Sequence, residues 1–398
     1  MGGLAGLAGL YSRYWPEDGL YNACTAESLP ESLSENFLIQ KAIDGLDFTQ
    51  VWDNHVHVVG IGDQSKDLWV NPDLMSWGHP LKHIQLRFYL DASCTGDQSA
   101  VDQGYVDRMN NVMRDLPAGM KAMLLAFDYY HNEQGVKDLE KSFFYTSNKY
   151  AAEIYESNRE RFEWVASIHP YRENSIELLK EAKDRGARAI KWLPEAMGID
   201  PASSKCTPFY QAMQKYNVPL LSHAGHETAV GTSGHPDSGN PLLLRHALDQ
   251  GVKVIVAHCA SLGSAKDLDK GSKGSEKSCF DLFVRMMNEA NYNDLLCGDI
   301  SALLQMNRLD EPVKQLLLKE EWHSRLINGS DYPLPGILPI IPLKMIKRMG
   351  LLSSEQSLVL REVRKYNPMW FDFLLKRMIR WQGKGFSNSV FETRGHFQ

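Results

Sequence analysis

The chain has 398 residues, of which 43% are hydrophobic and 23% are charged, as is usual for a folded globular protein. Its formal net charge of -6 argues against a nucleic-acid-binding surface, which normally carries a basic excess. No apolar stretch approaches the roughly 20 residues that a membrane-spanning helix needs.

The chain begins with a short apolar stretch, residues 1–11, which lacks the basic start of a signal peptide. This stretch is either a flexible start or the remnant of a trimmed membrane anchor. The cytoplasm is slightly favoured as the location, and a periplasmic or membrane-tethered protein is the alternative. Residues 1–50 are expected to form an arm and a helix outside the main domain.

The six cysteines form no C-x-x-C pair and no dense framework, so a zinc–thiolate site is not indicated. In a chain of this length we expect free thiols. Cys24 and Cys94 are the pair to test as a disulfide if the protein is exported.

Eight short apolar segments follow one another along the chain and predict strands. They cover residues 51–59, 122–128, 162–169, 187–193, 218–224, 253–258, 295–301 and 325–331. Apolar runs without strict alternation are typical of buried parallel strands.

The segments between these strands suit crossover helices. Residues 174–184 have apolar side chains at helical spacing and stop before Gly186, and residues 208–216 and 240–250 behave similarly. Eight alternating units favour an α/β fold of the (β/α)8 TIM-barrel type, over residues 51–380. An open doubly wound sheet is the rival on this pattern alone. Helices follow from residue 338, and residues 381–398 are expected to be a tail.

Two segments interrupt the repeat. Residues 60–121 form a long insertion after the first strand, and they include Trp77, Arg87 and Tyr89. Because barrel active sites lie beyond the carboxyl ends of the strands, this insertion is either a lid or substrate wall, or a packing subdomain. Residues 266–277 are polar and rich in glycine and serine, which predicts a mobile, solvated loop.

Histidine and aspartate side chains recur where predicted strands end. His55 and His57 point to the same side of the first strand, because side chains alternate along a strand. His223 ends the fifth strand, His258 the sixth and Asp331 the eighth. Since these strand ends meet at one rim of a barrel, the pattern predicts a shared metal site.

These motifs resemble the amidohydrolase superfamily. More narrowly, the chain is similar to the amidohydrolase-related branch that also contains aminocarboxymuconate-semialdehyde decarboxylase. The likeness covers roughly residues 51–370. Its specific pieces are the H-x-H of the first strand, residues 219–227, 254–263 and 326–333, and Tyr366-Asn367-Pro368. The resemblance implies a barrel, a divalent metal, and hydrolysis or decarboxylation of small molecules.

The expected ligands are His55, His57, His223 and Asp331. Three imidazoles and a carboxylate suit zinc, with manganese or iron as alternatives, and one metal per chain is favoured over two. Asp331 is expected to act as ligand and general base. His258 is expected to polarise a substrate carbonyl, to stabilise an oxyanion or to serve as a further ligand, and the resemblance favours the first two roles.

Lys191, near the end of the fourth strand, has two alternatives. It either becomes a carboxylated lysine that bridges two metals, or it binds a substrate carboxylate. Asp299 is a further pocket candidate, although a structural carboxylate at a strand end is favoured. Other possible substrate-binding residues are His169, Arg87, Glu195, His226 and Glu227.

The leading functional hypothesis is a metal-dependent hydrolase that cleaves a C–N or C–O bond of an amide, ester or lactone. A non-oxidative decarboxylase and a catalytically inactive metal-binding scaffold are the alternatives. The expected partner is a small-molecule substrate, with no nucleic acid. A homodimer is expected only by analogy with relatives.

Overall fold

The structure is a computed structural model that describes residue 19 and residues 22–398, except for 97–98, 228 and 232–235. The apolar start of the chain, and with it the possible membrane anchor, lies outside the described residues. Within the described part, no helix combines the length and the apolar composition that crossing a membrane requires.

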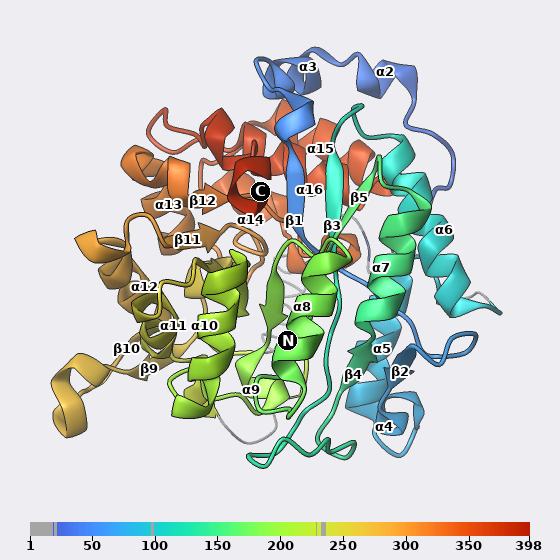
Figure 1. Ribbon diagram of the computed structural model, residues 1–398. Helices are drawn as coiled ribbons and strands as arrows, with labels where there is room; N and C mark the ends of the chain where they lie inside the picture. Colours follow the sequence, from blue (N-terminus) through green and yellow to red (C-terminus); the bar gives the residue numbers. More distant parts are fainter. Residues whose placement is uncertain (1–18, 20–21, 97–98, 228, 232–235) are drawn as a thin grey trace, which may run out of the picture.

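All eight predicted strands are present and run parallel (Figure 1). They are β1 (Trp52–His57), β3 (Lys121–Leu125), β5 (Phe162–Val165), β6 (Ile190–Trp192), β7 (Leu220–His223), β8 (Val254–Ala257), β11 (Leu296–Asp299) and β12 (Leu326–Ile327). Hydrogen-bonded pairing gives a three-stranded sheet, β1-β3-β5, and a five-stranded sheet, β12-β11-β8-β7-β6.

Two parallel bridges join these sheets into a closed barrel. Ala166, just after β5, pairs with Ile190 of β6, and Val56 of β1 pairs with Tyr332 beyond β12. The backbone of Asp331 also donates to the carbonyl of His55 at 2.8 Å. The sequence-based prediction of a (β/α)8 barrel is confirmed, and the open sheet is excluded.

Helices precede each later strand and surround the barrel (Figure 1). They are α6 (Val101–Arg114), α7 (Asn148–Ser157), α8 (Ser175–Asp184), α10 (Thr207–Tyr216), α11 (Arg245–Asp249), α12 (Cys279–Met287) and α13 (Glu311–Leu318). The predicted helix at 240–250 is a 3-10 turn, Pro241–Leu244, that continues into α11. Gly186 and Gly251 follow their helices with positive φ, which glycine adopts without strain.

The barrel interior is filled with apolar side chains. One buried cluster collects residues from all eight strand segments: Trp52, Met123, Leu125, Val165, Ala189, Leu221, Ile255, Ala257, Cys297 and Ile327. Phe397, from the last turn of the chain (Arg394–Phe397), belongs to the same cluster. Thr393 bonds to the backbone of Trp52, so the segment expected as a tail closes the amino-terminal end of the barrel.

Helices from both ends of the chain pack against one another outside the barrel. The amino-terminal pair is α2 (Glu31–Ser34) and α3 (Phe37–Ile43), and the carboxyl-terminal set is α14 (Leu343–Arg348), α15 (Ser354–Tyr366) and α16 (Pro368–Met378). Figure 1 shows α3 beside the carboxyl terminus, on the side of the barrel opposite α4 and α9 (Pro194–Met197).

The insertion after β1 forms a small unit of its own. It contains β2 (Leu68–Val70), α4 (Pro72–Met75) and α5 (Pro80–Ala92), and β2 pairs antiparallel with β4 (Phe144–Thr146). A separate apolar cluster holds it together: Val70, Leu74, Leu86, Leu90, Val101 and Phe143. The buried Asp102 carboxylate accepts four backbone N–H groups from residues 61–65, which fixes the chain where it leaves the barrel.

The segment 266–277 differs from its prediction. It forms a hairpin of β9 (Ser264–Lys266) and β10 (Glu276–Ser278) rather than an irregular loop. Arg285 of α12 pairs with Asp267 at 2.7 Å and with Asp269 at 2.6 Å. These partners are distant in the sequence, so local composition gave no sign of them.

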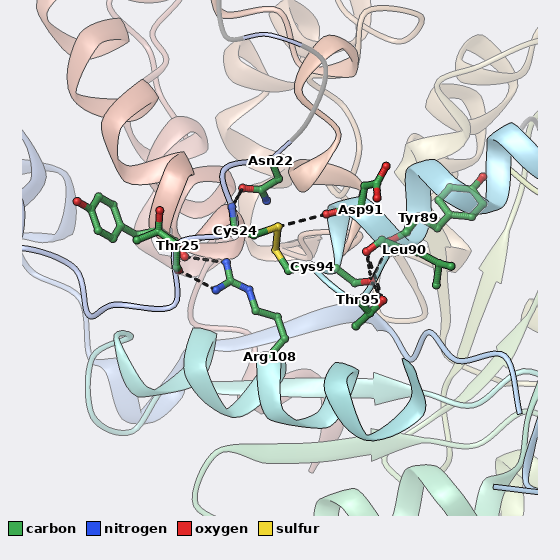
Figure 2. Close-up of a disulfide and its surroundings, with 11 residues drawn as sticks. Asn22, Cys24, Thr25, Tyr89, Leu90, Asp91, Cys94, Thr95 and Arg108 are labelled. Carbon is green, nitrogen blue, oxygen red and sulfur yellow. Dashed lines mark hydrogen bonds between the residues drawn. A yellow bond between two sulfur atoms is a disulfide. The ribbon is translucent and has the colours of Figure 1, made fainter. Parts of the chain in front are cut away.

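A disulfide ties the amino-terminal arm to the insertion (Figure 2). Cys24 and Cys94 are bonded, with their Cα atoms 5.4 Å apart, and Cys94 lies just after α5. Arg108 of α6 donates to the Thr25 carbonyl at 3.0 Å and to the Tyr366 carbonyl at 2.9 Å. The expectation of free thiols therefore fails for this pair. The other four cysteines are free and buried.

Candidate functional site

A cavity opens at the carboxyl ends of the strands, where the predicted site residues meet. Polar side chains line its floor: His55, His57, Lys191, His223, Glu227, His258, Gln305, Arg308 and Asp331. Its walls are mostly apolar, and Leu86 and Tyr89 of α5 contribute to them. The insertion therefore contributes side chains to the cavity and also has its own apolar cluster.

The first strand and the loop after β12 bring two histidines to one carboxylate. Asp331 Oδ1 lies 3.2 Å from His57 Nε2 and 3.6 Å from His55 Nε2. Asp331 has a positive φ of 59°, which is uncommon outside glycine, and such conformations occur often at functional sites. The prediction that these three side chains converge is confirmed.

His55 is held by a carboxylate behind it. Its Nδ1 lies 2.7 Å from Asp299 Oδ2, and both side chains are fully buried. A carboxylate only accepts hydrogen bonds, so Nδ1 carries the proton and Nε2 presents its lone pair to the cavity. Such a carboxylate partner is the usual support for a metal-binding histidine. Asp299 is thus placed behind the site rather than in the cavity.

His258 is oriented in a similar way by Ser301. The Ser301 hydroxyl donates to Asp299 at 2.6 Å, so it accepts from His258 Nδ1 at 2.8 Å. His258 Nδ1 also lies 3.1 Å from the Ser301 carbonyl, another acceptor. His258 Nε2, 4.0 Å from Asp331 Oδ2, therefore carries a lone pair. This tautomer suits a ligand or proton acceptor, and donation to an oxyanion would require prior protonation.

The surroundings of His223 are those expected of a metal ligand. Its Nδ1 lies 3.4 Å from Glu227 Oε2, while its Nε2 is buried without any hydrogen-bond partner among the described residues. An unpaired buried polar atom is costly, and a bound cation would satisfy it. The ring packs edge-on against His258, with 5.3 Å between centroids.

Burial shifts the pKa values of the histidines and the aspartate on the floor of the cavity. It lowers the pKa of His223 to about 3 and holds the pKa values of His55 and His258 well below their usual range. Neutral imidazoles are the form that binds metals. Burial pushes the pKa of Asp331 upward, but His55, His57 and Lys191 together outweigh it, so the pKa falls and the carboxylate is ionised at neutral pH.

Lys191 lies beside the histidines of β1. Its Nζ is 3.2 Å from His55 Nε2, and its side chain is buried. Burial lowers the pKa of Lys191 to about 8, against the pull of Asp331, Asp299 and Glu227. This position is compatible with both alternatives for Lys191, carboxylation and substrate binding.

Among the residues that the structure describes, two overlapping groups of side chains have metal-binding spacing: His55, His57 and Asp331, and His55, His258 and Asp299; the expected ligand His223 is in neither group. In the second group, Asp299 is occupied by hydrogen bonds from His55 and Ser301. We therefore interpret Asp299 as a support for the ligands, which favours one metal at the first group.

The other residues predicted to bind substrate differ in whether they line the cavity. Glu227 lines the cavity, and Glu195 stands behind it, accepting from the Glu227 backbone at 3.1 Å. His169 is buried elsewhere, with Nε2 bonded to the Met197 carbonyl at 3.0 Å. His226 is exposed and does not line the cavity. These placements weaken the case for His169 and His226 as substrate-binding residues.

Arg87 does not reach the cavity. It lies on α5 facing the arm, and its guanidinium donates to the Gly96 carbonyl at 2.8 Å. The arginine that does line the cavity is Arg308, together with Gln305, and the sequence analysis selected neither. Both lie in the turns that follow β11, a position that could have drawn notice because it is a strand-to-helix loop on the active face.

Solved structures with similar folds are only distantly related in sequence. An uncharacterised TIM-barrel protein from Bordetella bronchiseptica is 16% identical over 76% of this chain and 90% of its own, with a TM-score of 0.47. A putative 2-pyrone-4,6-dicarboxylic acid hydrolase from Pseudomonas putida is 15% identical over 82% and 99%, with a TM-score of 0.45. A dihydroxybenzoic acid decarboxylase from Polaromonas sp. JS666, solved with manganese and 2-nitroresorcinol, is 14% identical over 71% and 86%, with a TM-score of 0.43.

Among curated protein sequences, none matches this chain. A family model described as Amidohydrolase matches residues 53–336, which is more than half of the sequence. That range begins next to the two histidines of β1 and includes Asp331. The protein thus belongs to the amidohydrolase family of metal-dependent enzymes.

Proposed function

We propose that the protein is a hydrolase that cleaves a C–N or C–O bond of a small carboxylic-acid derivative, such as an amide, ester or lactone. The observation that carries this proposal is the position of Asp331. Its ionised carboxylate lies within 3.2 Å of His57 Nε2 and 4.0 Å of His258 Nε2, on the floor of a cavity with mostly apolar walls.

The metal would be held by His55, His57, His223 and Asp331. His55 and His223 each have an Nε2 that can bind a cation, and nitrogen with oxygen donors suits zinc, manganese or iron. A divalent metal bound there supplies Lewis acidity and lowers the pKa of a coordinated water from about 15.7 towards about 7. One metal per chain is favoured because Asp299 already serves as a hydrogen-bond acceptor.

Asp331 and His258 have different roles in the proposed reaction. Asp331 takes a proton from the attacking water as the water oxygen bonds to the carbonyl carbon. The carbonyl oxygen gains negative charge, and His258, with its proton held on Nδ1, remains a neutral lone-pair donor beside Asp331. The C–N or C–O bond breaks, and the proton held by Asp331 passes to the departing nitrogen or oxygen.

The first experiment tests the metal site. Elemental analysis of the purified protein should give one zinc, manganese or iron atom per chain, and His55→Ala should lower that content. Full metal occupancy in this variant would contradict the ligand assignment. Two atoms per chain would instead support a bridging, carboxylated Lys191.

The second experiment tests the reaction. The metal-loaded enzyme is screened with esters, lactones and amides in water enriched in oxygen-18, and the product acid should carry the label. Removal of the metal by a chelator should abolish this labelling, and added metal should restore it. Release of carbon dioxide without label in the product would identify a decarboxylase. Absence of any turnover in the metal-loaded protein would support the inactive scaffold.

A further inference from the structure

The cavity contains an arginine that has no anionic partner among the residues that the structure describes. Arg308 lines the cavity, and its side chain is almost completely buried, at 6% exposure. Its one side-chain hydrogen bond among the described residues is long, 3.4 Å from Nη1 to Ser261 Oγ. Its Nε is buried without a partner, and no carboxylate of the described residues lies within 4.0 Å of the guanidinium.

The loop that carries Arg308 is built to hold it in place. Leu303, Leu304 and Leu309 are buried on either side of it. The Met306 backbone donates to the Ile340 carbonyl at 2.8 Å, and the Arg308 backbone donates to the Gln305 carbonyl at 2.9 Å. These contacts hold the backbone of the loop that carries Arg308.

A buried guanidinium without an ionic partner destabilises the folded protein when no ligand is bound. A buried charge normally has an ionic partner or moves to solvent, because its lost hydration must be replaced. Burial lowers the pKa of Arg308, although Glu227, Asp331 and Asp299 attract its charge from a distance. Buried and without an ionic partner among the described residues, this guanidinium is arranged to receive an anion from the cavity.

We propose that Arg308 binds a carboxylate, or a similar planar anion, on the substrate at a point remote from the bond that reacts. A guanidinium forms paired, charge-assisted hydrogen bonds with such a group. The Gln305 side chain lines the same cavity, and its amide group is a further donor for an anion.

The surroundings define the rest of the substrate. Arg308 lines the same cavity as His223, His258 and Asp331. The walls that complete the cavity are apolar and include Leu86, Phe127 and Leu334. The substrate class is thus a compact molecule with an apolar body, a reactive group for the metal and a second, anionic group for Arg308. This inference rests on the proposed function for the position of the reactive group.

Binding of matched probes tests the inference without turnover. Isophthalate is compared with 3-carbamoylbenzoate, and glutarate with glutaramate, so that each pair differs by one carboxylate replaced by a neutral amide. Calorimetric titration of the metal-loaded enzyme should show the dianion of at least one pair binding about tenfold more tightly or better, since hydrogen bonds to charged groups are the stronger ones. In Arg308→Met that preference should disappear, and in Arg308→Lys it should be partly retained.

The control is Arg87→Met, which removes an arginine of α5 that lies outside the cavity and should leave the preference unchanged. Melting temperature and metal content are measured for each variant. Arg308→Met should melt at the same or a higher temperature than the wild type, because it removes an unpaired buried charge.

Three outcomes would overturn the inference: no preference for either dianion in the wild type, a preference that persists in Arg308→Met, or loss of folding and metal in both Arg308 variants. The last would indicate a structural arginine. Hydrolysis plays no part in these measurements. A failure to find turnover therefore contradicts only the proposed reaction, whereas loss of the dianion preference contradicts only the role of Arg308.

Discussion

The two ends of the barrel are built from the same eight strands but treat polar groups differently. At the closed end, both carboxylate oxygens of Glu163 are paired, one with Lys121 at 2.7 Å and the other with Arg188 at 2.8 Å. At the open end, His223 Nε2 and Arg308 Nε are buried without a hydrogen-bond partner among the described residues. A bound metal and a bound anion would complete these two groups.

This difference separates stability from activity within one fold. Barrel enzymes place chemistry at the carboxyl ends of the strands, so the other end is free to be optimised for packing. The closed end is sealed by the last turn of the chain, which places Phe397 in the interior cluster. Substitutions at the two ends should therefore affect different measurements, stability at one and metal binding or turnover at the other.

The largest effect is expected at the open end. Asp331→Asn keeps the size of the side chain but removes its capacity to accept a proton, so turnover should fall by about a hundredfold to ten-thousandfold. Thermal melting should show an intact fold. The measurement is kcat/KM on whichever ester, lactone or amide the enzyme turns over. An unchanged rate would remove Asp331 from the mechanism.

The counterpart at the closed end is Phe397→Ala. This change empties part of the barrel interior and should lower the free energy of unfolding by about 3 kcal/mol. Metal content and turnover of the folded enzyme should stay the same, since the cavity lies at the other end. Phe37→Ala, on the exposed face of α3, is the control and should change stability by less than about 0.5 kcal/mol. Loss of activity without loss of stability would refute the separation.

The disulfide should affect stability to a smaller degree. Replacing Cys24 and Cys94 by serine should lower the free energy of unfolding by about 2 kcal/mol, because the bond restricts 70 residues of the unfolded chain. A reductant should lower the melting temperature of the wild type and leave that of the double variant unchanged. Equal responses of both proteins would show that the bond does not form.

The smallest effect is expected for Asp299→Asn. The amide no longer fixes the His55 tautomer as strongly, so metal affinity should fall by about tenfold. Competition with a chelator of known affinity gives the measurement. Asp269→Asn, in the β9–β10 hairpin, provides a matched control far from the ligands. Comparable losses in the two variants would mean that Asp299 has no special link to the metal.

The features that follow from local sequence were predictable. Strand segments were apparent as short apolar runs, and alternation along β1 placed His55 and His57 on one face. The convergence of Asp331 with these histidines followed from the barrel, because parallel strands end at one rim. The roles assigned to the site residues remain predictions until the experiments above are done.

Features that depend on distant partners were not predictable. Arg308 lies in turns without periodicity, and only the fold shows that its guanidinium is buried at the cavity. The 266–277 hairpin is held by the ion pair with Arg285 of α12. The end of the chain is held at the base of the barrel, where Phe397 packs into the interior cluster. His169 ends its predicted strand as the ligands do, yet its side chain turns to the Met197 carbonyl.

The position of the disulfide along the chain has a consequence for biosynthesis. Both of its cysteines lie within the first 94 residues, whereas closure of the barrel needs Tyr332 to pair with Val56. Since synthesis proceeds from the amino terminus, Cys24 and Cys94 can meet an oxidant before Cys206, Cys259, Cys279 and Cys297 emerge. The order of the six thiols thus favours correct pairing during translation or export, and the four later ones are buried once folding ends.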